Sequence, residues 1–172
     1  MCDSSQLEIL YKIIDNLINY VDAAYMNVRQ FRSTTGFCYI IDEASVIWMS
    51  KQQSITAQST TESEYIMLNE IAKQAIWLCH LLYALQKSHV YRKKATLIYE
   101  NNQDSINLSV NSVFHSWTKH IQIRYHTIQE YIENNEIRIE FISMNHMLAD
   151  DLIKELNHIK FEQMIEELNL TN

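Results

Sequence analysis

The sequence predicts an α/β domain built on a five-stranded mixed sheet flanked by helices. Three β-prone segments come first, a long amphipathic helix follows, and two further β-prone segments then alternate with helices. Successive strands joined by short connections pair antiparallel, whereas a strand that follows a helix is best satisfied by parallel pairing. The order of the segments therefore indicates a sheet with an antiparallel part and a parallel part.

The first three strands are predicted from runs of aromatic and β-branched residues. They cover residues 17–25 (LINYVDAAY), 34–40 (TTGFCYI) and 45–50 (SVIWMS). The polar stretch at 26–33 and the short segment at 42–44 are the expected connections. With one Gly and no Pro in the chain, turns have to be built from Asn, Asp and Ser.

Residues 61–86 are predicted to form a long amphipathic helix, because apolar side chains recur there at steps of three and four residues. The apolar stripe consists of Leu68, Ile71, Ala72, Ala75, Leu78, Cys79, Leu82 and Leu85. The hydroxyls of Ser59, Thr60 and Thr61 are candidate N-caps, and an acid three residues on, Glu62 or Glu64, completes a capping-box pattern.

The rest of the chain continues the alternation of strands and helices. The predicted elements are a strand at 95–100, a short helix at 103–110, a helix at 119–133, a strand at 137–141, and one broken or two short helices at 147–168. Asn134 and Asn135 are the expected terminators of the helix that precedes them. No linker or repeat divides the chain, so residues 17–172 are predicted as one domain, with residues 1–16 as a partly ordered N-terminal extension.

Composition restricts the class of protein. A hydrophobic content of 47% with 20% charged residues is typical of a globular domain, and 172 residues are enough to bury a core. The formal charge of −7 argues against broad binding to phosphate backbones, although it is compatible with a local basic patch. Three widely spaced cysteines indicate neither a disulfide framework nor a zinc site. No apolar run approaches about twenty residues, so we expect a soluble intracellular protein with no membrane partner.

The helical period separates the acids at the start of the long helix. Glu64 lies four residues before Leu68 and seven before Ile71, so it extends the buried stripe to the rim of the sheet. Glu62 lies about 200° from Glu64 around the helix and is expected to face water. Glu64 is therefore the candidate for chemistry, and a purely capping role is the open alternative.

Two further positions permit either a structural or a functional interpretation. Asp22 lies inside a predicted strand, so its charge has to be paired, exposed on an edge strand or used in a site. Asp150 and Asp151 open the last helical segment, where the helix macrodipole also favours acids. Each position alone is compatible with a structural role.

Five segments together carry a resemblance to a known family. The string QSTTESEYIMLNEIAKQAIWL is similar to the helix-opening motif of the ribonuclease H domains of copia-type retrotransposons. Four further blocks stand in the family's order, namely YVDAAY with FRSTTGF, IYENNQDSI, KHIQIRYHTIQEYI and LADDLIKEL. The resemblance covers residues 17–170 and implies the ribonuclease H-like fold, which has a five-stranded mixed sheet.

The resemblance also implies an activity. Enzymes of this family hydrolyse the RNA strand of RNA–DNA hybrids with two Mg²⁺ ions held by four carboxylates, and an intact element carries a reverse transcriptase upstream. One ion activates the attacking water and the other stabilises the leaving oxygen. Matched position by position, the resemblance assigns metal binding and catalysis to Asp22, Glu64 and Asp150. It leaves the oligomeric state open.

The fourth carboxylate of the family is missing. The family places Asp-Asn at the end of the fourth strand, where this chain has Asn101 and Asn102. The amide oxygen of Asn101 can coordinate a metal but is neutral, and one unit charge at about 4 Å is worth about 4 kcal/mol at an effective dielectric of roughly 20. Glu100 is expected on the opposite face of the strand and Asp104 in the next turn, so neither is expected to replace the missing acid.

Three basic side chains, Lys119, His120 and Arg124, cluster on the predicted helix at 119–133 and are candidates for contacts with nucleic-acid phosphates. A solvated surface is the alternative, because Ile121 and Tyr125 by themselves explain why that helix packs.

Three hypotheses about function result. The first is a retrotransposon ribonuclease H domain whose catalysis is impaired or lost. The second is a non-catalytic module of the same fold that binds nucleic acid or protein. The third is an active ribonuclease for RNA–DNA hybrids that tolerates Asn101.

Overall fold

The computed structural model describes residues 17–27, 32–41, 44–85, 95–110 and 119–170. Within these residues five strands form one sheet in the order β3-β2-β1-β4-β5, which confirms the predicted fold class. The strands are β1 (Leu17–Asn27), β2 (Arg32–Ile41), β3 (Ala44–Gln52), β4 (Thr96–Glu100) and β5 (Ile137–Phe141). The predicted N-terminal extension at 1–16 lies outside the described residues.

The central strand β1 pairs differently on its two sides. β2 is antiparallel to β1 and β3 is antiparallel to β2, whereas β4 is parallel to β1 and β5 is parallel to β4. In this register Asp22 lies opposite Gly36 of β2, and Val21 lies opposite Glu100, the last residue of β4. Asp22 therefore lies beside the carboxyl end of β4.

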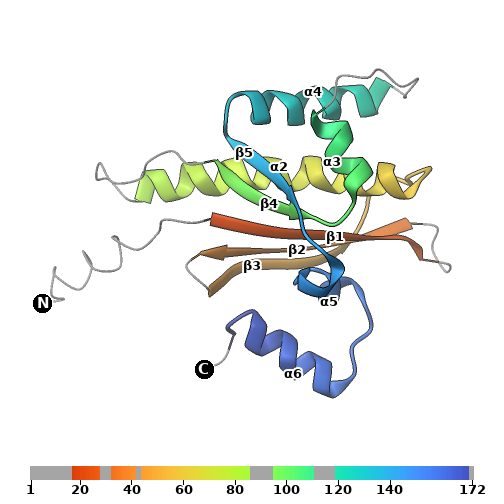
Figure 1. Cartoon of the computed structure of the whole chain (residues 1–172), viewed down its shortest axis with the longest axis vertical. Coiled ribbons are helices and arrows are strands. Elements are labelled where there is room, and N and C mark those ends of the chain that lie inside the picture. The colour runs from red at the N-terminus through yellow and green to blue at the C-terminus, as the bar shows by residue number, and fades with distance from the viewer. Residues whose placement is uncertain (1–16, 28–31, 42–43, 86–94, 111–118, 171–172) are drawn as a thin grey trace, which may run out of the picture.

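Helices cover both sides of the sheet (Figure 1). The helices α2 (Thr60–Leu85), α3 (Gln103–Val110) and α4 (Lys119–Glu133) lie on one side. After β5 come η1 (Met144–His146), α5 (Asp150–Ile153) and α6 (His158–Glu167), and both α5 and α6 lie on the opposite side of the sheet, where α5 packs against β1 and β2. The C-terminal helical segment is thus two helices. None of the helices in the described ranges has the length and apolar character needed to cross a membrane.

The hydrophobic core lies between α2 and the sheet. Six members of the predicted apolar stripe are buried, namely Leu68, Ile71, Ala72, Ala75, Leu78 and Leu82. They pack against buried residues of the sheet such as Val21, Tyr39 and Ile98. The Tyr39 hydroxyl also donates a hydrogen bond to the carbonyl oxygen of Ile71 at 2.7 Å. Burial of this apolar area fixes α2 across the sheet, and with it the acids in its first turns.

The start of α2 confirms the predicted cap and corrects one expectation. Ser59 Oγ accepts a hydrogen bond from the Glu62 backbone N–H at 3.1 Å, as an N-cap side chain does. Glu62 is buried, whereas we expected it to face water. The reason is that Glu62 Oε2 accepts a hydrogen bond from the Gln58 backbone N–H at 2.7 Å, so the side chain folds back over the first turn.

An asparagine ends α4, as predicted. Asn135 has a φ of 55°, a left-handed conformation that Gly usually supplies at this point of a helix. Asparagine tolerates this conformation better than most residues with a Cβ atom. In a chain with one glycine, asparagine therefore takes over a glycine role.

Gly36, the single glycine of the chain, lies where α5 approaches the sheet. A Cβ atom at this position would lie 2.6 Å from Ile153 Cγ2 and 2.9 Å from the carbonyl oxygen of Ala149. The Ala149 oxygen belongs to the backbone, so it cannot rotate away from such a contact. The missing side chain at Gly36 is therefore what allows α5 to lie so close to β2.

The substitution Gly36→Ala is expected to lower the free energy of unfolding by about 1–3 kcal/mol, because the added methyl group pushes α5 away from the sheet. Urea unfolding followed by circular dichroism measures the change. In an Ile153→Ala background, which removes the closest contact, the same substitution should cost less. A Gly36→Ala protein as stable as the wild type would contradict this explanation.

Candidate active site

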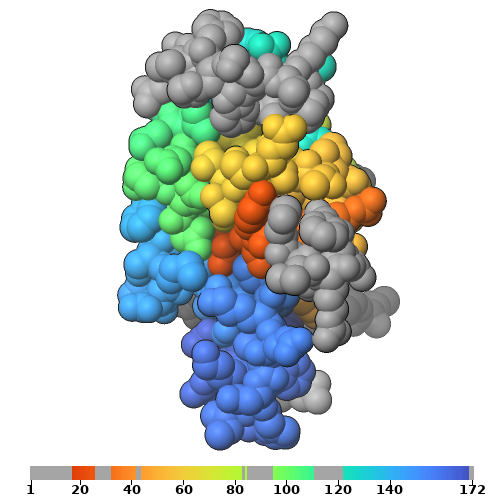
Figure 2. Space-filling model, turned by 90° about the vertical axis from the view of Figure 1, so that its right-hand side faces the viewer, coloured from red at the N-terminus to blue at the C-terminus, as the bar shows by residue number. Residues whose placement is uncertain are grey.

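Polar side chains from four elements meet at the rim of the sheet where β4 ends. Asp22 comes from β1, Glu64 from the start of α2, Glu100 from β4 and Asp150 from the start of α5, while Asn101 follows β4 directly. Asp22 interacts electrostatically with Asp150, Glu64 and Glu100, so these acids are neighbours in space. The start of α2, β1, the β4–α3 segment and the chain around α5 are visible together on one face (Figure 2).

Glu64 is positioned by a set of hydrogen bonds from Gln53. The Gln53 side-chain amide donates to the carbonyl oxygen of Ser63 at 2.9 Å and to Thr35 Oγ1 at 3.1 Å, and its backbone N–H donates to the carbonyl oxygen of Ser33 at 2.8 Å. These bonds attach the first turns of α2 to β2. The side chain of Glu64 is consequently held at the rim, where it is only 7% exposed.

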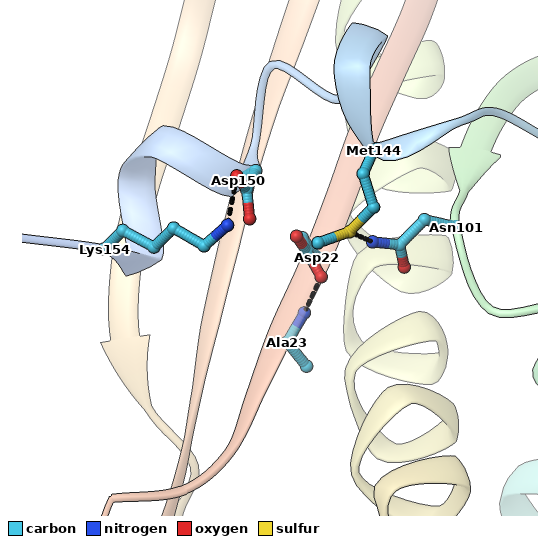
Figure 3. Close-up of polar contacts among 6 residues, drawn as sticks. All are labelled: Asp22, Ala23, Asn101, Met144, Asp150 and Lys154. Atoms are coloured by element: carbon cyan, nitrogen blue, oxygen red, sulfur yellow. Dashed lines mark hydrogen bonds and ion pairs between the residues drawn. The ribbon is translucent and has the colours of Figure 1, made fainter. Parts of the chain in front are cut away.

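Asp22 lies at the centre of the group and is 4% exposed. Its Oδ1 accepts a hydrogen bond from the Ala23 backbone N–H at 2.8 Å, and Asp150 and Asn101 approach it from different elements (Figure 3). Burial raises the pKa of Asp22 to about 6, and the neighbouring carboxyl group of Asp150 acts in the same direction. Hydrogen bonds from the Asn101 side chain and the Ala23 amide oppose this rise in pKa.

Lys154 supplies a positive charge at the edge of the site. Its Nζ lies 2.6 Å from Asp150 Oδ2, one helical turn away (Figure 3). The Lys154 side chain is half-exposed, so the ion pair is screened by water and contributes little to stability. It does balance the charge of Asp150 in the absence of other cations.

Two buried glutamates form the inner part of the site. Burial raises the pKa of Glu64 to about 10, and the nearby carboxyl groups of Glu100 and Asp22 add to the effect. Glu100 is fully buried, which raises the pKa of its carboxyl group well above the ordinary value. The Oε2 atom of each glutamate is buried without a hydrogen-bond partner among the described residues. At the start of α2, backbone N–H groups donate hydrogen bonds to the side chains of Ser59 and Glu62, while a functional role of Glu64 stays a prediction.

The position of Glu100 agrees with the predicted alternation of faces. Glu100 pairs in register with the core residue Val21 and lies on the same buried face of β4 as Ile98, whereas Asp22 pairs with Gly36 on the face that α5 covers. β4 ends at Glu100, and Asn101 follows in a bend. The side chain of Asn101 donates a hydrogen bond to Met144 Sδ at 3.0 Å and also bonds to Asp22.

Asn102 and Asp104, which follow Asn101, have structural positions. Asn102 Oδ1 accepts hydrogen bonds from the backbone N–H groups of Asp104 at 3.0 Å and Ser105 at 3.1 Å, so Asn102 caps α3. Asp104 is exposed in the first turn of α3. The geometry agrees with the expectation that Asp104 does not replace the acid missing at position 101.

The donor set fits a hard divalent cation. Carboxylate oxygens are the preferred ligands of Mg²⁺, and buried glutamate oxygens without partners are available on both Glu64 and Glu100. In the described part of the chain, however, no three acidic, histidine or cysteine side chains are already arranged around one point as a metal site. Side-chain rotation would have to bring the acids together around an ion.

The predicted basic cluster is only partly described. The side chains of Lys119 and His120 lie outside the described residues. Arg124 is half-buried on α4, and its carbonyl oxygen accepts a hydrogen bond from the Asn69 side chain of α2 at 3.1 Å. This bond attaches α4 to α2, while a contact of the basic side chains with phosphate stays a prediction.

The relatives of the chain include polyproteins of plant transposons. The retrovirus-related Pol polyprotein from transposon TNT 1-94 of Nicotiana tabacum is 37% identical over 147 residues, which cover 85% of this chain and 11% of that protein. The corresponding polyprotein from transposon RE1 of Arabidopsis thaliana is 30% identical over 153 residues, covering 88% of this chain and 10% of that protein. The chain thus spans about a tenth of the length of these relatives. No family model matches the chain.

Solved structures with the same fold are ribonucleases H. The crystal structure of LC11-RNase H1 in complex with an RNA/DNA hybrid superposes with a TM-score of 0.55 and 11% identity, covering 80% of this chain and 94% of that one. At this level of identity the likeness establishes the fold alone. The fold implied by the sequence resemblance is thereby confirmed.

Without metal ions, the free energy of unfolding is expected to decrease as the pH rises from about 5 to about 9. The pKa values of Asp22 and Glu64 are raised in the folded protein, so it holds protons that the unfolded chain releases in this range. The stability that these bound protons contribute is complete below the pKa values of the unfolded chain. It is lost as the pH rises past the pKa values of the folded protein. Glu64→Gln should therefore raise the free energy of unfolding at pH ~8 by about 1–3 kcal/mol.

Urea unfolding in EDTA at pH ~5 and pH ~8 measures this dependence. The matched control is Glu70→Gln, which neutralises an exposed acid on the same helix and should leave the pH dependence as it is. A wild-type protein that is more stable at the higher pH would contradict the prediction.

Proposed function

We propose that this chain, a ribonuclease H-like domain related to one segment of the retrovirus-related Pol polyproteins of transposons, derives from an enzyme that hydrolyses the RNA strand of RNA–DNA hybrids, and that Asn101 impairs this reaction. The observation that carries the proposal is the grouping of Asp22 and Asp150 with the neutral amide of Asn101 beside them (Figure 3), together with the electrostatic contact between Asp22 and Glu64.

The acids have the chemistry needed to hold Mg²⁺. Asp22 interacts with both Asp150 and Glu64, so these three acids would hold Mg²⁺ together. When bound, Mg²⁺ would supply activation of the attacking water and stabilisation of the leaving oxygen. Because Lys154 already pairs with Asp150, binding has to displace its ammonium group.

Asn101 weakens this site in two ways. Its side chain carries no charge, and the loss of one unit charge at about 4 Å costs about 4 kcal/mol at an effective dielectric of roughly 20. Its side-chain amide also donates a hydrogen bond to Met144 Sδ at 3.0 Å and interacts with Asp22, so a donor group stands beside Asp22 where a carboxylate would supply a ligand. Both effects lower the affinity for a cation and support impaired catalysis.

We assign an RNA–DNA hybrid as the ligand of the domain. LC11-RNase H1, which has the same fold, was solved in complex with such a hybrid. The net charge of −7 requires that phosphate contacts come from a local basic cluster, for which Lys119, His120 and Arg124 are the candidates. In an intact element, a reverse transcriptase domain upstream would be the covalent partner.

A non-catalytic interaction module is the second candidate function, because one observation favours it. The Lys154–Asp150 ion pair balances one of the three acids without a metal ion. A domain that keeps this pair can hold its fold at the site with no cation bound, and its remaining role would be binding to nucleic acid or protein.

The substitution Asn101→Asp is expected to raise the rate of hybrid cleavage by about 100-fold or more, because it restores a charge worth several kcal/mol to the metal site. Cleavage of a labelled RNA–DNA duplex in Mg²⁺ and in Mn²⁺ measures the rates of the wild type and the variant. The variant Gln74→Glu, at an exposed position of α2, controls for the added negative charge.

Equal cleavage by the wild type and Asn101→Asp would contradict impairment and would support an active hybrid ribonuclease. If neither protein cleaves but both bind the hybrid at moderate salt, the non-catalytic module is the better description.

A further inference from the structure

Glu100 lies at the site, although the family pattern gives it no function. It is the last residue of β4, pairs in register with Val21, and interacts electrostatically with both Asp22 and Glu64. Its side chain is 0% exposed. A fully buried carboxyl group at a strand end is costly, since burial of an unpaired charge is strongly unfavourable. Its presence therefore calls for a partner.

Backbone capping accounts for only half of the Glu100 carboxyl group. Oε1 accepts a hydrogen bond from the Asn102 backbone N–H at 3.2 Å, which fixes the turn between β4 and α3. Oε2 is buried and has no hydrogen-bond partner among the described residues. The same is true of Oε2 of Glu64, its acidic neighbour. Two unpartnered buried oxygens on adjacent acids are the arrangement that a shared cation satisfies.

Position and charge agree with this interpretation. Glu100 lies on the α2 face of β4, in register with Val21 and on the same face as Ile98. Its carboxyl group is a neighbour of Glu64 at the rim. The side chain of Asn101 interacts with the same residue, Asp22, that Glu100 does. With Asp22, Glu64, Glu100 and Asp150, the site contains four acids although position 101 is an amide.

We propose that Glu100 is a metal ligand that replaces the missing carboxylate at position 101, so that the site binds divalent cations through Asp22, Glu64, Glu100 and Asp150. This inference rests on the proposed function. The site binds a divalent cation more weakly than it would with a carboxylate at position 101, but it still binds one. The remaining affinity depends on Glu100.

Direct titration with Mn²⁺ tests the inference. Mn²⁺ is chosen because it takes oxygen ligands as Mg²⁺ does and because free Mn²⁺ gives a quantifiable electron paramagnetic resonance signal. The proteins compared are the wild type, Glu100→Gln, Asn101→Asp, the double variant with both changes, and the control Glu70→Gln. Circular dichroism verifies that each protein is folded. Because Glu100→Gln removes a buried acid, we expect this variant to be at least as stable as the wild type in EDTA.

Glu100→Gln is expected to weaken Mn²⁺ binding at least tenfold, whereas Glu70→Gln should change it by less than about twofold. The double variant should bind Mn²⁺ more tightly than Glu100→Gln, because an aspartate at 101 restores a carboxylate. Equal Mn²⁺ affinity of Glu100→Gln and the wild type would overturn the proposal and leave Glu100 as a backbone cap. A wild type that binds no Mn²⁺ at millimolar concentration would overturn it as well.

The two proposals can fail independently. If Asn101→Asp cleaves hybrids while Glu100→Gln keeps the Mn²⁺ affinity of the wild type, the proposed function stands and the role of Glu100 is wrong. If Mn²⁺ binding depends on Glu100 but none of the variants cleaves a hybrid, the metal ligand stands and the hydrolytic ancestry of the site is not supported.

Discussion

Electrostatic repulsion among buried acids is the constraint on which this structure depends. Asp22, Glu64 and Glu100 are almost completely removed from water and interact with one another at a single rim of the sheet. Such a group is stable only if protons or cations neutralise it, since the protein interior screens charge poorly. Raised pKa values are the response of the metal-free protein, and a bound divalent cation would be the alternative response.

The fold supplies the stability that holds these acids together. Apolar contacts between α2 and the sheet set the position of Glu64, and the parallel pairing of β1 with β4 sets Glu100 beside Val21, the residue before Asp22. On the opposite side of the sheet, Gly36 lets α5 approach closely enough to bring in Asp150. The hydrophobic core therefore offsets the electrostatic cost of the site, as is common where binding residues are concentrated.

Local patterns were sufficient for most elements of the fold. The step of three and four residues between apolar side chains predicted α2, and the Ser59 cap located its first turn. Tertiary surroundings overruled local geometry at one acid. Glu62 is buried because its carboxyl group turns back to the Gln58 N–H. This fold-back is not encoded in a periodicity.

The sequence by itself determined which acids were available, the order of strands and helices, and the neutral side chain at Asn101, because these follow from residue identity and spacing. Only the tertiary structure decided that Glu100 joins Asp22 and Glu64, and that Lys154 balances Asp150. The physical reason is that burial and charge depend on contacts between segments far apart in the chain, which strand register and helix packing alone bring together.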